Sequence, residues 1–342
     1  MLSGPNHVFS FVCQQTGRCC RAGWKVEIDH YDQVNLVAKA RGTELEAAIA
    51  ERVVPDASDG EASEQAFERT YHLEKDACGA CSFLDGDRCG IHGALGPQAL
   101  PDPCRNFPVI AMKTAWGTEV GYNLACPHAI ALTAASPFSY ERREEWERPL
   151  DPQQTKATFI APDGGWNPFL ASRRAAIAKL SASTAETLLA DIAEAMSLLG
   201  SGSWTAADIE RWCDALALEP RVAVVIDECA PFLKTWGPAL GAAPSWSSLE
   251  DGLGLDPALA ARYLQHTLHT VYFRTGQPMG RAYLLALAAF AMAVRMAPAL
   301  SATYSKAPLR AAIVLTEVGL FGDLRSLGVV ELPPGPPEAV TA

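Results

Sequence analysis

Cysteine is the residue whose placement most constrains what this chain can fold into. The chain has 342 residues and ten cysteines, and only Cys213 and Cys229 lie beyond residue 126. The other eight form two blocks: Cys13, Cys19 and Cys20, then Cys78, Cys81, Cys89, Cys104 and Cys126. In a reducing cytoplasm, clustered thiols serve as metal ligands or redox groups more often than as disulfides. We therefore predict a metal-binding region in the N-terminal part of the chain.

The spacing within these blocks suits ligands that converge on a metal. Cys78 and Cys81 form a C-x2-C pair, which one tight loop can present together. A structural zinc takes four thiolate or imidazole ligands, and an iron–sulfur cubane, [4Fe–4S], also takes up to four. All eight N-terminal cysteines are candidate ligands, enough for two four-ligand sites or for one site with spare thiols. Cys213 lies on an apolar helical face and is predicted to be a core residue.

The hydrophobic pattern predicts a mainly α-helical protein with an irregular cysteine-rich N-terminal subdomain that contains a small β-hairpin. Only the N-terminal part carries clustered cysteines, whereas the C-terminal part shows helical periodicity throughout. We expect a metal-binding domain at 1–134, a surface connection at 135–168, a helical domain at 169–328 and a disordered tail at 329–342.

The hairpin is predicted between Cys104 and Cys126. Residues 108–112 and 119–124 are the expected strands. Both cysteines are equally distant from residue 115, so this hairpin would bring their sulfurs to the same open end. Cys126 also directly precedes a predicted helix, whose dipole favours the thiolate form.

Capping residues predict where the other elements begin. A strand is expected at 24–28 and an exposed loop or insertion at 55–75, because that segment is acidic and poor in apolar residues. The most apolar helix is expected at 280–297 and the last at 307–321. The remaining helices should start at the capping residues Asp29, Thr43, Ser183, Thr205 and Asp256.

The net charge and the longest apolar stretch limit the partners of the chain. A charge of −11 repels phosphate backbones, so we expect no nucleic-acid partner. The longest apolar stretch, 282–294, is shorter than the roughly 18–20 residues that cross a bilayer, so we expect a buried helix and no membrane. No secretory signal is visible at the N-terminus. These features predict a cytoplasmic protein and leave its oligomeric state open.

Several segments of the cysteine-rich part match motifs of a known family. Residues 11–20, FVCQQTGRCC, resemble the FxCxxCGxCC opening of the cysteine-cluster proteins, which are described as zinc- or iron-chelating domains. Residues 81–92 resemble their CxFL…CxI signature, and residues 101–108 resemble their CRxFP element. Residues 20–29, CRAGWKVEID, are similar to the CCxGWxVxID stretch of larger members, the flagellin lysine-N-methylases, and residues 124–129 to their CPEA-type element.

The resemblance implies an iron–sulfur enzyme that methylates protein lysine side chains with S-adenosylmethionine, with a protein such as flagellin as substrate. Two positions depart from the pattern: Thr16 stands where shorter members have a cysteine, and His128 where the methylases commonly have a glutamate. The residues by themselves show no Rossmann glycine motif, no GxSxG elbow and no P-loop, so they assign no catalytic or donor-binding residue. The alternative is a non-catalytic protein with structural zinc or iron and a helical interaction module. A metal carrier is a weaker option.

A few other polar residues carry weaker signals. His266 and His269 lie one turn apart on a predicted helix. A substrate-facing or metal pair is one reading, but the simpler one gives them no role in a site, because spacing alone rarely predicts a site and the sequence shows no third ligand. Arg21 and Arg105 flank cysteines, and they either support thiolate character or form surface salt bridges.

Overall fold

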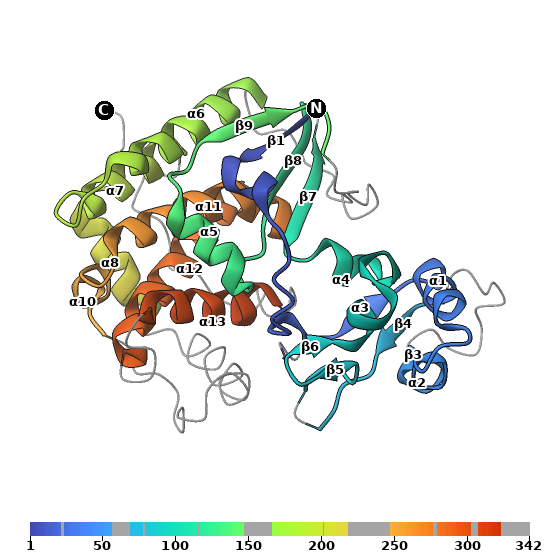
Figure 1. The fold of residues 1–342 in the computed structure, drawn as a ribbon. Coiled ribbons are helices and arrows are strands. Elements are labelled where there is room, and N and C mark those ends of the chain that lie inside the picture. The colour runs from blue at the N-terminus through green and yellow to red at the C-terminus, as the bar shows by residue number, and fades with distance from the viewer. Residues whose placement is uncertain are drawn as a thin grey trace. The chain divides into compact units, whose positions relative to one another are not determined.

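The computed structural model describes residues 1–21, 24–56, 69–77, 79–114, 116–146, 166–200, 202–217, 247–275, 279–301 and 307–322. The fold is mainly α-helical, with small sheets, which confirms the predicted class at that level (Figure 1). The chain divides into two compact units. Residues 13–107 form one, here called the cysteine-rich unit, and residues 1–12 with 108–342 form the other, the helical unit.

Short helices and strands make up the cysteine-rich unit. Its three-stranded antiparallel sheet has the order β2-β4-β3, and a two-stranded ladder joins β5 and β6. The strands are β2 (Val26–Ile28), β3 (Val53–Pro55), β4 (Tyr71–Leu73), β5 (Leu84–Asp85) and β6 (Arg88–Cys89). The helices are α1 (His30–Ala40), α2 (Glu46–Arg52), α3 (Gly90–Leu95) and α4 (Asp102–Asn106), with 3-10 turns at Cys19–Arg21 and Pro97–Ala99.

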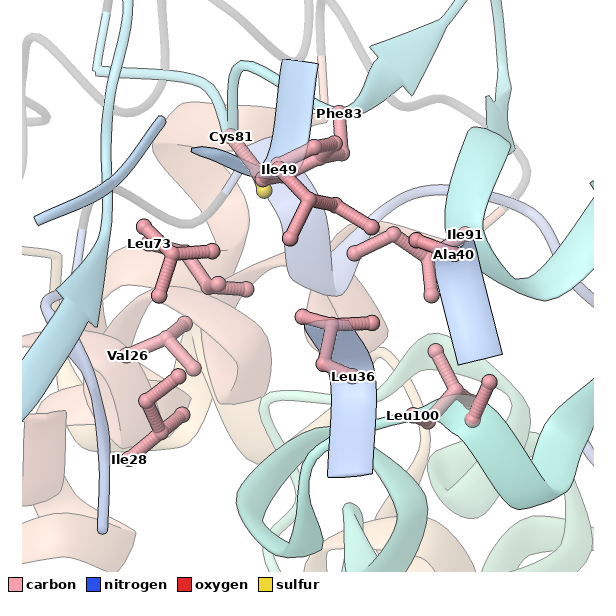
Figure 2. Packing of buried hydrophobic residues seen from close by; sticks show 12 residues of the cluster. Val26, Ile28, Leu36, Ala40, Ile49, Leu73, Cys81, Phe83, Ile91 and Leu100 are labelled. Carbon is pink, nitrogen blue, oxygen red and sulfur yellow. The ribbon is translucent and has the colours of Figure 1, made fainter. Parts of the chain in front are cut away.

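One hydrophobic core holds the cysteine-rich unit together (Figure 2). Burying its aliphatic and aromatic side chains supplies the main stabilisation of the unit. The core side chains are Val26, Ile28, Leu36, Ala40, Ile49, Val53, Leu73, Cys81, Phe83, Ile91, Ala99 and Leu100. Cys20, Cys89 and Cys104 pack against this core from its edge, as does Trp24.

The expected loop at 55–75 contains a strand instead. Tyr71–Leu73 pairs with both β2 and β3, and Leu73 is buried in the core. The central position of β4 outweighs the polar composition of the segment that precedes it. Residues 57–68 of the same segment lie outside the described residues.

The helical unit combines a four-stranded sheet with a helical body. The sheet has the order β7-β8-β1-β9, in which β1 is parallel to β8 and the other pairs are antiparallel. The strands are β1 (Leu2–Pro5), β7 (Val109–Thr114), β8 (Gly117–Tyr122) and β9 (Tyr140–Arg143). The helices are α5 (Pro127–Ala135), α6 (Trp166–Lys179), α7 (Leu188–Leu198), α8 (Ala206–Ala217), α10 (Leu249–Leu253), α11 (Pro257–Thr275), α12 (Met279–Leu300) and α13 (Pro308–Gly322).

Helix α11 connects the sheet to the rest of the helical unit. It packs against β8, α5, α6 and α12, and α12 packs against α13 (Figure 1). Among the described residues, one helical stretch, Ala282–Leu300, is long and apolar enough to cross a membrane. Because 78% of that stretch is buried inside the fold, it has the properties of the buried helix that the sequence predicts.

Most local predictions in the helical unit are confirmed. The hairpin β7–β8 forms with Thr114 opposite Gly117, and α8 and α11 begin after Thr205 and Asp256. Helix α7, like helix α2 of the cysteine-rich unit, begins a few residues later than expected, because Thr187 and Thr43 bond within the preceding turns.

The compact units group the chain differently from our predicted domains. Residues 108–134 pack with the helical unit, and the predicted connection at 135–168 contains β9 and the start of α6. The predicted tail at 329–342 lies outside the described residues.

Candidate metal centre

The first cysteine block enters the core of its unit through a tight 3-10 turn. The amides of Cys20 and Arg21 donate to the carbonyl oxygens of Gly17 and Arg18, both at 3.1 Å. Gly17 has φ +63°, and a Cβ at this position would press on the main chain of Asp87. Glycine is therefore required at position 17 for Cys19 and Cys20 to turn toward the core.

The second block supplies Cys81 and Cys89 from two short connected segments. Cys81 pairs with Lys75 in an isolated β-bridge, closed by a turn in which the amide of Gly79 donates to the carbonyl of Asp76 at 2.9 Å. The β5–β6 ladder sets Cys89 opposite Leu84. Cys89 also caps α3, since its Sγ accepts a hydrogen bond from the amide of His92 at 3.5 Å.

Cys104 comes from α4, which packs on β2. The amide of Asp102, the first residue of α4, donates to Asp32 Oδ2 at 2.9 Å and so fixes this helix to α1. Cys20, Cys81, Cys89 and Cys104, here called the thiol cluster, therefore come from four separate segments and share one core.

Mutual contacts and burial keep the thiol cluster protonated. The hydrogen bond between Cys19 and Cys20, with Sγ atoms 4.0 Å apart, raises the pKa of Cys20 to about 12, and burial adds to this effect. A hydrogen bond to Cys20, with burial, raises the pKa of Cys89. Burial raises the pKa of Cys81 and of Cys104. Two effects make each thiol resist ionisation. Negative charge on a neighbouring sulfur would repel a second thiolate, and burial excludes the water that would solvate the thiolate.

The thiol cluster provides the donors for a thiophilic metal, but its sulfurs do not converge on one point. Among the described residues, no three His, Cys, Asp or Glu side chains are arranged to hold a metal ion. The donor chemistry fits zinc or an iron–sulfur cluster, since each accepts four thiolates. A ligand shell would require the sulfurs to move closer together.

The other predicted ligands have different positions. Cys13 is exposed, and its Sγ accepts a hydrogen bond from the amide of Gln15 at 3.4 Å. Cys126 is at the N-cap of α5, as expected, but belongs to the helical unit, so its pairing with Cys104 stays a prediction. Cys78 and Cys229 lie outside the described residues.

Lys75 is a charged neighbour of the thiol cluster that our reading of the sequence missed. Its Nζ is buried, with no hydrogen-bond partner among the described residues. The positive charge of the ammonium favours the thiolate forms of Cys81 and Cys104. It therefore partly offsets the rise in pKa that burial causes at both thiols. A lone lysine in an acidic loop carries no motif, so only the β-bridge to Cys81 reveals its position.

His266 and His269 are structural, as the simpler reading of the sequence expected. Nε2 of His266 lies 3.0 Å from the carbonyl oxygen of Tyr122, and Nε2 of His269 lies 2.9 Å from that of Val120. Nδ1 of His269 also contacts the hydroxyl of Tyr140 at 3.1 Å. These contacts attach α11 to the sheet.

A buried ion pair lies near His269. Arg173 donates two hydrogen bonds to Glu119, at 2.6 and 2.9 Å, and both side chains are almost fully buried. Trp116 Nε1 donates a third bond to Glu119 at 3.0 Å. Burial is the largest single effect and opposes ionisation of the carboxyl, but the Arg173 and His269 charges and the hydrogen bonds from Arg173 and Trp116 together lower the pKa of Glu119. This network fixes α6 to β8.

The two arginines beside the cysteines form ion pairs. Arg21 bonds Asp87 at 2.9 Å and the carbonyl oxygen of Gly86 at 2.6 Å. Arg105 pairs with Asp102 one turn earlier in α4. Both arginines therefore act as the salt-bridging residues that one of the two sequence readings expected.

Comparison with known proteins adds no relative. No family model, no curated protein and no solved structure matches this chain. The resemblance to the cysteine-cluster proteins therefore depends on the quoted motifs alone.

Proposed function

We propose that the cysteine-rich unit binds a thiophilic metal through Cys20, Cys81, Cys89 and Cys104. The observation that carries this proposal is that four separate segments bring these thiols to one core. If these cysteines served only as small apolar side chains, nothing would require two blocks far apart in sequence to lie close together in the fold. Four thiolates complete the shell of a structural zinc, and they also suit a [4Fe–4S] cluster.

Metal binding would change the charge of the thiol cluster. Cys20 shares hydrogen bonds with Cys19 and Cys89, and burial raises the pKa of Cys81 and Cys104, so the thiols hold protons that a soft metal replaces. Side-chain rotation about Cα–Cβ is the smallest movement that brings such sulfurs together. The proposal therefore includes a local rearrangement of the thiols on binding.

The enzymatic part of the proposal is a protein-lysine N-methylase that uses S-adenosylmethionine. The motif resemblance at residues 11–29 and 81–108 supports it, and flagellin is the substrate class that the resemblance suggests. An iron–sulfur cluster held by three of the four thiolates would leave one iron open, and that iron would supply a coordination position for the methyl donor. We also place the protein in the cytoplasm, where free thiols persist.

A second candidate function is a purely structural metal site. Cys81 is part of the hydrophobic core itself, with 6% of its surface exposed, and the other three thiols pack against that core. A metal held there would stabilise the small unit directly, as structural zinc does. The helical unit would then be the interaction module.

A Cys19→Ser/Cys20→Ser variant separates the two functions. If the site is catalytic, the variant stays folded by circular dichroism but loses binding of S-adenosylmethionine and methylation of lysine in flagellin. If the metal is structural, the cysteine-rich unit unfolds. Cys213→Ser, which changes a buried thiol of the helical unit, is the control. It should keep both the folded cysteine-rich unit and the binding of S-adenosylmethionine. Donor binding and methylation unchanged in the double variant would contradict the catalytic proposal.

A further inference from the structure

Lys75 differs from the other described lysines of its unit in having no visible counter-charge. Lys25 pairs with Asp56, and Lys39 lies exposed on α1. The Nζ of Lys75 is buried and forms neither a hydrogen bond nor an ion pair with any described residue. The side chain as a whole is only half-buried, but an ammonium shielded from water with no partner is unfavourable, so its position calls for an explanation.

The surroundings of Lys75 point to the thiol cluster as its partner. Its main chain is bridged to that of Cys81, and its charge acts on both Cys81 and Cys104. Asp76, the next residue, uses Oδ1 to accept a hydrogen bond from the amide of Ala80 at 2.9 Å. The charge of the ammonium therefore acts on thiols, which carry no charge while they are protonated.

We propose that Lys75 supplies the counter-charge for a metal–thiolate centre formed by Cys20, Cys81, Cys89 and Cys104. Each thiol loses one proton to solvent when it binds, so four thiolates on one Zn²⁺ leave a net charge of two minus. A buried ammonium beside this centre offsets one of those charges. The inference depends on the metal site proposed above and adds a residue that sets its affinity without being a ligand.

Zinc affinity of a Lys75→Met variant tests this role. Competition with a chromogenic chelator at fixed pH and salt measures the affinity, and Co²⁺ reports thiolate coordination through its charge-transfer band. We expect Lys75→Met to bind Zn²⁺ at least about tenfold more weakly than the wild type, since a unit positive charge attracts nearby thiolates strongly where water is excluded. Lys75→Arg should restore the affinity, and Lys39→Met should leave it unchanged.

The outcomes separate this inference from the metal site itself. Unchanged affinity in Lys75→Met, with a wild type that binds Zn²⁺ and shows thiolate bands with Co²⁺, would overturn the role of Lys75 alone. A wild type that binds neither metal would overturn both proposals. If circular dichroism shows that Lys75→Met does not fold, Lys75→Gln, which keeps a polar group without a charge, takes its place with the same expectations.

Discussion

The main-chain amide of Cys81 donates a 2.7 Å hydrogen bond to the carbonyl oxygen of Cys20. This bond joins the two cysteine blocks at the residues whose side chains lie in or beside the same core. The backbone therefore fixes the neighbourhood of the thiols independently of their side-chain rotamers. A metal would act on an arrangement that the fold already holds.

Cys13 provides a test of which thiols belong to the centre. It is exposed and is not one of the thiols that pack against the core. We expect Cys13→Ser to retain the bound metal, whereas Cys89→Ser should lose at least half of it. Metal content per chain checks this, and loss of the metal from Cys13→Ser would extend the ligand set to the first cysteine.

The buried pair Glu119–Arg173 should be costly to break on one side. Glu119→Gln leaves the Arg173 guanidinium charged and buried, so we expect a loss of about 3–5 kcal/mol in unfolding free energy. Glu194→Gln removes the exposed partner of Lys179 and should cost less than about 1 kcal/mol. Urea unfolding measures both. Equal, small losses would show that Arg173 finds other partners.

Two buried histidines should make the stability depend on pH. Burial lowers the pKa of His7 and of His269 from 6.5 to about 4, so the unfolded chain takes up protons first as the pH falls. The contribution of these two histidines to the free energy of unfolding is fully present above pH 6.5, and it is lost as the pH decreases toward 4. At pH 5 the loss should be about 2 kcal/mol for each histidine.

Unfolding in urea at neutral pH and near pH 5 checks this dependence. His269→Gln should lose less stability between the two conditions than the wild type, because it removes one of the two groups. A pH dependence as steep as that of the wild type would show that His269 is not one of the groups responsible.

Close packing of α10 on α12 should make Gly252 irreplaceable. A Cβ on Gly252 would collide with the carbonyl oxygen of Val294, which belongs to a helix and cannot move aside cheaply. We expect Gly252→Ala to cost about 1–3 kcal/mol. Gly93 in α3 has open space around it, so Gly93→Ala is the control and should be neutral or slightly stabilising. Thermal unfolding compares them, and equal melting temperatures would contradict the collision.

Local patterns were readable from the sequence. Asp29 caps α1 by accepting a hydrogen bond from the amide of Asp32 at 2.8 Å, and Cys126 occupies the N-cap position of α5, as their neighbours predict. The face of α8 that carries Trp212 and Cys213 is buried. Each of these features depends on residues within one turn, where spacing alone decides the geometry.

Features that depend on contacts between residues far apart in the chain could not be predicted from the sequence. Strand β1 pairs in parallel with β8, and β4 lies between β2 and β3, although its Tyr71–Leu73 follows a polar segment. The partners Glu119 and Arg173, and the position of Lys75 beside Cys81, depend on tertiary packing that no local pattern encodes. The number of N-terminal cysteines predicts that several thiols lie close together. Their spacing does not indicate which four of them share the core.

The most direct test of the metal centre is its metal and inorganic sulfide content after purification without oxygen. We expect stoichiometric zinc, or iron with matching sulfide and broad visible absorbance. Serine variants of Cys20, Cys81, Cys89 and Cys104 should each lose it, whereas Cys213→Ser retains it. A wild-type protein without bound metal, or four variants that keep it, would contradict the account.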